Sequence, residues 1–130
     1  MVPILCFDRD PWEREQRLLD DWKPAHDRAG AMVCARCTSV ITSISSRITM
    51  HGAHYHRLVN PAGMVFEVGC YRDATGLRIV GEPTYDHTWF TGYAWQVVNC
   101  SRCQSHLGWR FIGGHTFFAF ILRQLREAHS

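Results

Sequence analysis

Two Cys-x-x-Cys pairs set the strongest constraint on what this chain can fold into. They are Cys34 with Cys37 and Cys100 with Cys103. Two intervening residues let a tight turn direct both sulfurs at one ion, and two such turns complete the tetrahedral Cys₄ shell that zinc favours. Four thiolates leave no position for an activated water, so the sequence predicts one structural Zn²⁺ per chain, tying the first β segment to the end of a sheet.

The alternative interpretation of these pairs is a redox motif or unrelated cysteines. A thioredoxin-like site needs a βαβ setting, which this sequence lacks. The apolar start, residues 1–7, has no basic region and meets Asp8 at once, so we expect no export signal. A reducing, cytoplasmic location follows as an expectation, and there clustered cysteines more often bind metal than form disulfides.

The composition fits one ordered globular domain. Of the 130 residues, 46% are apolar and 20% are charged, which argues against disorder. The formal net charge is only +2 and the basic residues are scattered, so no stripe exists to neutralise phosphates and nucleic acid is not an expected partner. No apolar run approaches the roughly 20 residues of a membrane span, so no membrane partner is expected.

The pattern along the chain predicts a mostly β fold between two helices. Asp10 and Pro11 read as the start of an N-terminal helix that ends near Lys23, followed by a linker. Short β-rich runs are predicted within residues 38–49, 64–71, 77–80 and 93–99, and residues 60–63 suit a hairpin turn. A C-terminal helix is predicted from Thr116, with an apolar stripe of Phe118, Ile121, Leu122 and Leu125. The expected division is an N-terminal helix and linker over 1–33 and a zinc-binding β domain with its helix over 34–130.

Three tryptophans lie close together beside the second cysteine pair. They are Trp89, Trp95 and Trp109, and the first two flank a turn that contains Gly92. A turn is a poor place to bury two indoles in a shared core, which favours an aromatic cage open to a ligand. Ordinary core packing is the competing interpretation, because indole is bulky and often buried. Composition alone leaves both open.

The order of motifs resembles one known family. The Asn60-Pro61-Ala62-Gly63 turn, the strings His87-Thr88-Trp89-Phe90 and Gly92-Tyr93-Ala94-Trp95, the second cysteine pair and Ser105-His106-Leu107-Gly108-Trp109 follow each other as in the thalidomide-binding (CULT) domain of the cereblon family. The chain is most similar to the short, free-standing bacterial members. The resemblance covers about residues 34–126.

The resemblance implies a fold and a site. The fold is a β-tent, two antiparallel sheets packed at a steep angle and pinned by the Cys₄ zinc. The site is a cage of Trp89, Trp95 and Trp109 that holds cyclic imides of the glutarimide type, or related rings such as uridine. Around this cage the family's remaining binding positions fall on Asn60, Pro61, Asp86, His87 and Phe111. The family's Lon-like domain does not match here, so no ubiquitin-ligase adaptor is expected as a partner.

The chemistry of an imide fits these residues without the resemblance. An imide presents two carbonyl acceptors around one N–H donor, so it needs a donor–acceptor–donor edge. The His87 ring, the His87 carbonyl and the Trp89 amide could supply that edge from one stretch of backbone. Indole walls would desolvate the flat ring and leave only this edge for polar contacts.

Other functions remain open from the sequence. An aromatic cage also binds methylated ammonium groups, with Asp86 as a helper. A methionine-sulfoxide-reductase-like enzyme would need Cys6 or Cys70 as nucleophile, but neither has an activating motif and Cys70 lies in an apolar strand, so we expect no catalytic residue. His51, His54 and His56 are expected to form a solvated hairpin rather than a second metal site.

Overall fold

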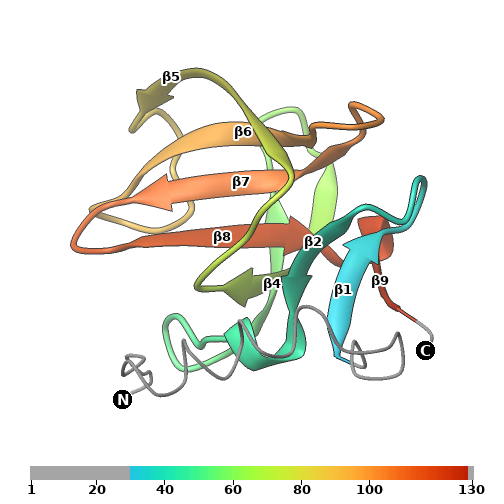
Figure 1. The fold of residues 1–130 in the computed structure, drawn as a ribbon. Helices are drawn as coiled ribbons and strands as arrows, with labels where there is room; N and C mark the ends of the chain where they lie inside the picture. Colours follow the sequence, from blue (N-terminus) through green and yellow to red (C-terminus); the bar gives the residue numbers. More distant parts are fainter. Residues whose placement is uncertain (1–29, 129–130) are drawn as a thin grey trace.

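The computed structural model describes residues 30–128, and most of them lie in β-strands (Figure 1). Their elements, in chain order, are β1 (Ala31–Cys34), β2 (Val40–Ser43), the 3₁₀ helix η2 (Ile44–Ser46), β3 (Tyr55–Val59), β4 (Val65–Tyr71), β5 (Leu77–Thr84), β6 (Ala94–Cys100), β7 (His106–Ile112), β8 (Thr116–Ile121), the 3₁₀ helix η3 (Leu122–Gln124) and β9 (Leu125–Glu127). The predicted N-terminal helix lies outside the described residues. The predicted division at residue 33 stays a prediction, and β1 begins at Ala31.

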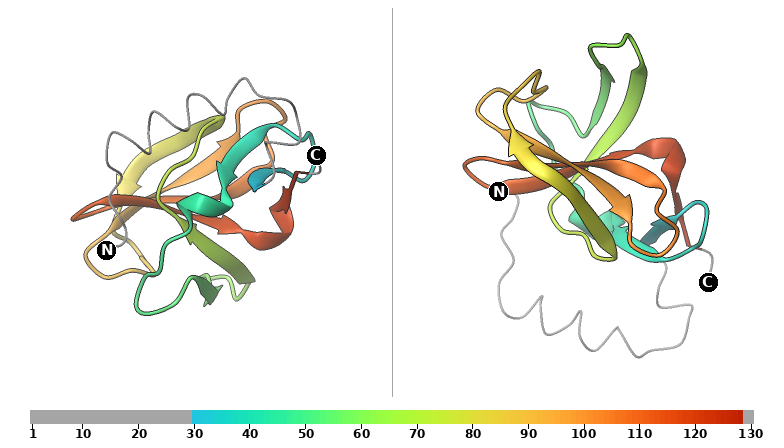
Figure 2. Two further views of the ribbon diagram at one scale, coloured as in Figure 1. Left: turned by 60° about the horizontal axis from the view of Figure 1, so that its bottom comes forward. Right: turned by 90° about the horizontal axis from the view of Figure 1, so that it is seen from above.

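The strands form two antiparallel sheets, which confirms the predicted class. The smaller sheet has the order β2-β1-β9 and the larger has the order β3-β4-β8-β7-β6-β5. In Figure 1, β1 and β2 run across the direction of β6, β7 and β8, and the two views of Figure 2 show the same crossed arrangement. Among residues 30–128, no helix is long and apolar enough to cross a membrane.

The predicted β runs are present, with shifted bounds. The run at 38–49 is a strand only over β2, after which the chain enters η2. The run at 77–80 extends through a bulge to Thr84, because β5 shifts its register on β6 between Val80 and Thr84. The predicted hairpin at 60–63 is confirmed, since it joins β3 to β4 with Val59 paired to Val65.

The predicted C-terminal helix is wrong. Residues 116–121 form β8, which pairs with β4 on one side and β7 on the other, and β9 completes the smaller sheet. Phe117, Ala119 and Ile121 face one core, while Phe120 faces the other. A strand buried on both faces is apolar at nearly every position. Some of these apolar residues then also have the spacing of a helical stripe, so periodicity cannot distinguish the strand from a helix.

The buried residues form two cores on opposite faces of the larger sheet. One lies near the cysteines, between the sheets, and contains Met32, Cys34, Ile41, Tyr71, Val98, Cys100, Leu107, Phe120 and Leu125. The other contains Phe66, Val68, Cys70, Phe90, Trp109, Phe111, Phe117, Ala119 and Ile121. Strands β7 and β8 contribute to both, so they form the centre of the domain.

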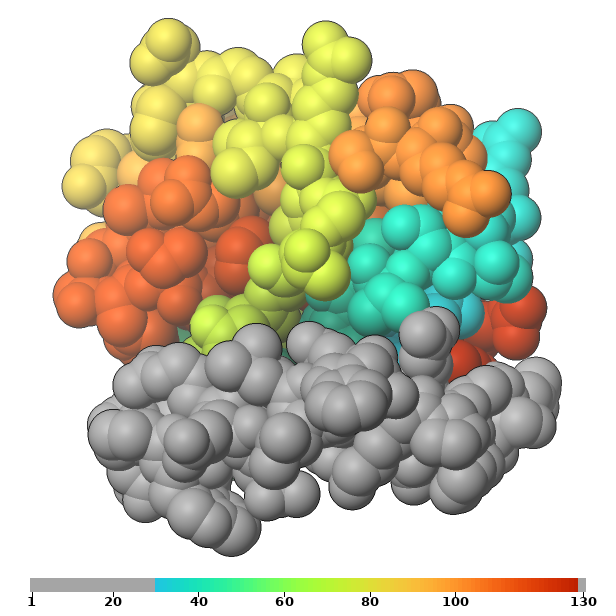
Figure 3. Space-filling view, in the orientation of Figure 1, coloured from blue at the N-terminus to red at the C-terminus, as the bar shows by residue number. Residues whose placement is uncertain are grey.

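The connection from β4 to β5 helps to join the two sheets. The N–H of Thr75 donates to the Ile41 carbonyl in β2 at 2.7 Å, and the N–H of Ser101 donates to the Gly76 carbonyl at 2.9 Å. In Figure 3 the yellow-green part of the chain runs across the surface beside both the teal residues and the orange residues at the right of the view. These bonds support the same junction that the cysteines occupy.

One glycine is required by the close approach of two central strands. Gly108 in β7 lies opposite Phe120 in β8, and a Cβ at this position would come within 2.1 Å of the Ala119 carbonyl oxygen. No side chain fits there without separating the strands. Gly108 therefore lets β7 and β8 pair closely directly beside Trp109.

The histidine-rich hairpin is less solvated than expected. His54 and His56 are half-buried, and their rings contact the carbonyls of Ile48 (3.1 Å) and Ala53 (3.0 Å). Among residues 30–128, the group of metal-binding side chains that lie close together is that of the four cysteines, and the histidines do not join it. The expectation against a second metal site stays a prediction. Burial of the His54 ring lowers its pKa.

The buried His54 predicts a loss of stability in mild acid. Its pKa is lower in the folded chain than the ordinary value of about 6.5, so the unfolded chain binds the proton more readily. The free energy of unfolding is therefore highest above pH 6.5, where the His54 ring is neutral in both states, and it decreases as the pH falls below 6.5. Urea unfolding between pH 8 and pH 5 measures this slope.

The variant His54→Asn keeps a donor toward the Ile48 carbonyl but does not titrate, so its unfolding free energy should depend less on pH than that of the wild type. His115→Gln, at an exposed position in the turn between β7 and β8, is the control and should keep the full slope. An equal slope in His54→Asn and wild type would contradict the prediction.

Candidate functional site

The four cysteine sulfurs converge on one point, as the two pairs predict. All four lie within 4.8 Å of one another, with Cys34 and Cys103 at 3.6 Å and Cys37 and Cys100 at 3.5 Å. A regular tetrahedron with Zn–S bonds of about 2.3 Å has sulfur atoms about 3.8 Å apart. The donor set and its spacing therefore fit one zinc ion.

The two cysteine turns share the same backbone geometry. The N–H groups of Thr38 and Gln104 donate to the carbonyls of Cys34 and Cys100, both at 2.8 Å. The N–H groups of Cys34 and Cys100 in turn donate to the carbonyls of Ser39 and Ser105. Thr38 and Gln104 occupy the equivalent left-handed position, with φ of 64° and 68°. Equal spacing in the sequence has thus produced two matching turns, each directing a pair of sulfurs inward.

The metal centre connects the two sheets. Cys34 ends β1 in the smaller sheet and Cys100 ends β6 in the larger one. The Ser105 hydroxyl lies 3.1 Å from the Cys103 sulfur, and this hydrogen bond lowers the pKa of Cys103. It therefore favours the thiolate form that a zinc ligand needs.

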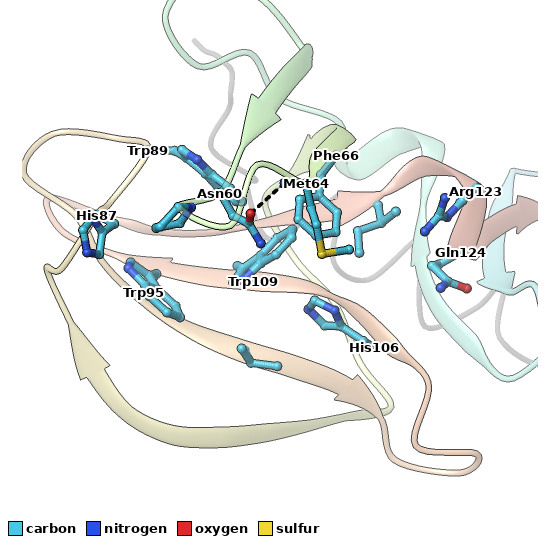
Figure 4. Close-up of a pocket in the computed structure, with 13 residues that line it drawn as sticks. Asn60, Met64, Phe66, His87, Trp89, Trp95, His106, Trp109, Arg123 and Gln124 are labelled. Atoms are coloured by element: carbon cyan, nitrogen blue, oxygen red, sulfur yellow. Dashed lines mark hydrogen bonds between the residues drawn. The ribbon is translucent and has the colours of Figure 1, made fainter.

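A cavity of about 560 Å³ opens beside the second core, on the larger sheet (Figure 4). Its lining comes from the β3–β4 hairpin, the β5–β6 loop, β6, β7 and the chain around η3. The residues are Asn60, Pro61, Met64, Phe66, His87, Trp89, Trp95, Val97, His106, Trp109, Ile121, Arg123 and Gln124.

The three predicted tryptophans all line this cavity, but in different environments. Trp109 is 7% exposed and belongs to the second core, while Trp89 and Trp95 are half-buried. Trp89 meets Trp109 edge-on, with ring centroids 4.7 Å apart, and Phe66 meets Trp109 at 5.0 Å. Trp109 is therefore both a wall and a core residue, whereas Trp95 is mainly a wall.

Indole N–H groups hold two of the walls. Trp89 Nε1 donates to the Val59 carbonyl at the end of β3 (2.9 Å), and Trp95 Nε1 donates to the Asp86 carbonyl in the β5–β6 loop (2.7 Å). Both polar atoms are thus satisfied within the protein. The apolar faces of the two rings remain for contact with a ligand.

Asn60 holds the turn at the other side of the cavity. Its Oδ1 accepts the backbone N–H groups of Ala62 (3.0 Å) and Met64 (2.9 Å), and Figure 4 marks the second bond. These two donors fix the orientation of the amide, because only oxygen can accept them. The Asn60 NH₂ group has no partner among the described residues and can donate to a ligand.

The β5–β6 loop leaves a set of backbone groups unused. His87 has a left-handed φ of 56°, which is uncommon outside glycine and costs free energy. Within the described part of the chain, neither the His87 carbonyl nor the Trp89 N–H forms a hydrogen bond, although Asp86 N–H and Thr88 N–H on the same loop do. The exposed His87 side chain lines the cavity next to them.

Two predicted binding residues do not line the cavity. Phe111 is 1% exposed and packs against Phe90 and Phe117 in the second core. It pairs with Trp95 across β6 and β7, so it supports the strand that carries this wall. Asp86 contributes its backbone carbonyl to the Trp95 indole, while its side chain is outside the lining.

Several lining residues were not predicted, and His106 shows why. Strict alternation along β7 would place Leu107 beside Trp109. A bulge intervenes, because Val98 pairs with Gly108 and Asn99 pairs with His106, so Leu107 is skipped. His106 therefore lies on the cavity side, 4.9 Å from the Trp109 ring centroid. Sequence spacing gives no signal for this bulge.

Comparisons with known proteins relate this chain to cereblon. No protein-family model matches the chain. Cereblon of Danio rerio is 37% identical over an alignment of 92 residues that covers 65% of this chain and 20% of that protein. The chain contains a cereblon-type domain. Cereblon of Gallus gallus is 42% identical over 53 residues, 41% of this chain and 12% of that protein. Cereblon of Drosophila melanogaster is 33% identical over 86 residues, 63% of this chain and 14% of that protein.

The cereblon-type domain thus spans at most about a fifth of these relatives' length. Similarity to the bacterial members in particular stays a prediction. The fold also occurs in a solved structure, the Mis18 "Yippee-like" domain, with a TM-score of 0.53 and 12% identity over 77% of this chain and 95% of that one. At this identity the likeness concerns the fold alone.

The metal centre of the cereblon-type domain predicts a zinc-dependent fold. Elemental analysis should give one zinc per chain, and a strong chelator should unfold the domain. The domain should unfold because the free energy of binding a structural zinc, about 10–16 kcal/mol in small domains, is as large as the free energy of unfolding of a whole domain, about 5–15 kcal/mol. Circular dichroism follows the unfolding.

Cys100→Ser should lose zinc together with the fold, while Cys70→Ser, which changes a buried cysteine outside the cluster, should keep one zinc per chain. A folded, metal-free wild-type protein would disprove the role of the metal.

The different burial of the tryptophans predicts different costs of removal. Trp109→Ala empties part of the second core and should lower the free energy of unfolding by about 3–5 kcal/mol. Trp95→Ala removes a half-buried ring and one hydrogen bond, so about 1–2 kcal/mol is expected. Denaturant titration measures both. Equal costs for the two substitutions would contradict the assignment of Trp95 as mainly a wall.

Proposed function

We propose that this chain is a small-molecule binding module that holds a cyclic imide of the glutarimide type, or a related ring such as uridine, between Trp89, Trp95 and Trp109. The observation that carries the proposal is the unused polar edge on the β5–β6 loop. A ring with an N–H between two carbonyls is complementary to the His87 ring, the His87 carbonyl and the Trp89 N–H. These groups adjoin indole walls and have no partner among the described residues.

The backbone conformation of His87 supports the same proposal. A non-glycine residue in the left-handed region costs about 1–3 kcal/mol where the surroundings enforce it, and such strain is found at ligand clamps. Here the Trp95 indole and the Thr84 hydroxyl both bond to Asp86, directly before His87. The loop is held in its strained shape before any ligand binds, which lowers the ordering cost of binding.

The lining disfavours a reader of methylated ammonium groups. Such a cage gains from a nearby carboxylate, and Asp86 was the candidate. Among the described residues, no Asp or Glu lines the cavity, and the one formal charge in the lining is the positive Arg123. A neutral ring with polar edge atoms suits this lining better than a cation.

The buried thiol disfavours a reductase. Cys70 is fully buried in β4, and burial raises its pKa to about 12. A thiol of this kind is protonated at neutral pH and is a poor nucleophile. Cys6 lies outside the described residues. We therefore propose binding without catalysis, and no enzyme activity on imides or on methionine sulfoxide.

A titration with glutarimide tests the proposal. Binding should change the tryptophan fluorescence, and Trp95→Ala should weaken it by at least about 2 kcal/mol, roughly thirty-fold, as for a buried aromatic anchor. Since Trp95→Ala is expected to stay folded, the loss would report on the cage. N-methylglutarimide is the matched control ligand, because it lacks the N–H that the His87 carbonyl would accept, and it should bind much more weakly.

A trimethyl-lysine peptide that binds more tightly than glutarimide would favour the reader instead. Equal affinity of the wild type and Trp95→Ala for glutarimide would rule out the proposed cage.

A further inference from the structure

The cavity is too large for one imide ring. At about 560 Å³ it lies within the range of about 300–1,000 Å³ that buries most of a drug-sized ligand. The polar groups of the proposed imide edge lie around His87, at one end. Figure 4 shows Arg123 and Gln124 at the opposite end, with Trp109 and His106 between. A ligand that fills the cavity must therefore extend from the tryptophans toward η3.

The far end carries a positive charge that no acidic side chain among residues 30–128 pairs with. Arg123 is exposed, lines the cavity, and forms no hydrogen bond or ion pair with any residue of the described part. None of the lining residues in the described part of the chain is acidic. The neighbouring Gln124 bonds through its backbone carbonyl to Ala35 N–H, which fixes this end of η3 and leaves the Gln124 amide side chain facing the cavity. A guanidinium beside an amide donor is suited to a carboxylate or phosphate.

The middle of the cavity offers one acceptor among apolar groups. His106 Nε2 lies 3.1 Å from the Gly108 carbonyl, which can only accept, so Nε2 carries the hydrogen. Burial lowers the pKa of His106, so the ring is neutral at pH 7 and its Nδ1 is an acceptor. Phe66, Val97 and Ile121 complete this section. A ligand whose middle part is apolar and carries one N–H or O–H group would be complementary to this section of the cavity.

We propose that the end of the cavity at Arg123 and Gln124 is a second subsite, which binds an anionic group joined to the ring ligand through a linker that donates a hydrogen bond to His106. This inference rests on the proposed function, because the ring is assumed to occupy the tryptophan cage. The expected ligand class is a cyclic imide with an acidic tail, carboxylate or phosphate. Imides with cationic tails are excluded from this class, because Arg123 would repel the tail.

A series of substituted glutarimides tests the subsite. Each member carries an amide-linked acyl chain on a ring carbon, ends in a carboxylate, and is compared with its own methyl ester, over increasing chain lengths. At the length that spans the cavity, the acid should bind about three- to ten-fold more tightly than its ester, as for a partly exposed charge pair. The gain should shrink as the salt concentration rises.

Arg123→Gln should abolish the difference between acid and ester while leaving the affinity for unsubstituted glutarimide unchanged. The matched control is Arg126→Gln, three residues further on in β9 and outside the cavity lining, which should keep the difference. Acids that bind no better than esters at every length, or a gain that survives in Arg123→Gln, would overturn the subsite alone. If unsubstituted glutarimide does not bind the wild type, the proposed function fails and this inference fails with it.

Discussion

Coordination of one metal ion by four thiolates is the interaction on which the rest of this domain depends. It joins β1 of the smaller sheet to β6 of the larger one. Strand β6 carries Trp95 near its first residue and ends in Cys100, about 17 Å away at the usual rise of a strand. The same strand therefore connects the metal centre to a wall of the cavity. Metal binding therefore fixes this cavity wall indirectly, by fixing the strand that carries it.

The two central strands explain how so small a domain supports both a metal centre and a cavity. Strands β7 and β8 are buried on both faces, with one core beside the cysteines and another behind the tryptophans. Trp109 can line the cavity and still be 7% exposed because aromatic rings pack around it and Gly108 lets the neighbouring strand approach. The cavity is thus one surface of a core, and its lining and the core packing share residues.

The sequence predicts those parts of the structure whose geometry depends on neighbouring residues. It predicts less well those parts that depend on pairing between strands far apart in the chain. Two residues between cysteines determine a turn of defined shape, so the metal ligands could be predicted. The pattern of residues 116–121 predicts a helix where the chain forms β8, because burial on two faces removes the alternation that identifies a strand. His106 and Arg123 were missed as lining residues, because a bulge in β7 and the position of η3 after β8 bring them to the cavity. The predicted roles of Asp86 and Phe111 stay predictions.

The indole hydrogen bonds also have a dynamic consequence. Trp89 bonds to the end of one hairpin at Val59, and Trp95 bonds to a separate loop at Asp86. Neither loop can swing away from the sheet without breaking one of these bonds, and local opening of this kind has its own free energy, below that of global unfolding. An occupant that contacts both rings would couple the two openings thermodynamically. Occupancy would then be expected to slow hydrogen exchange at both indole nitrogens together, although they belong to different segments of the chain.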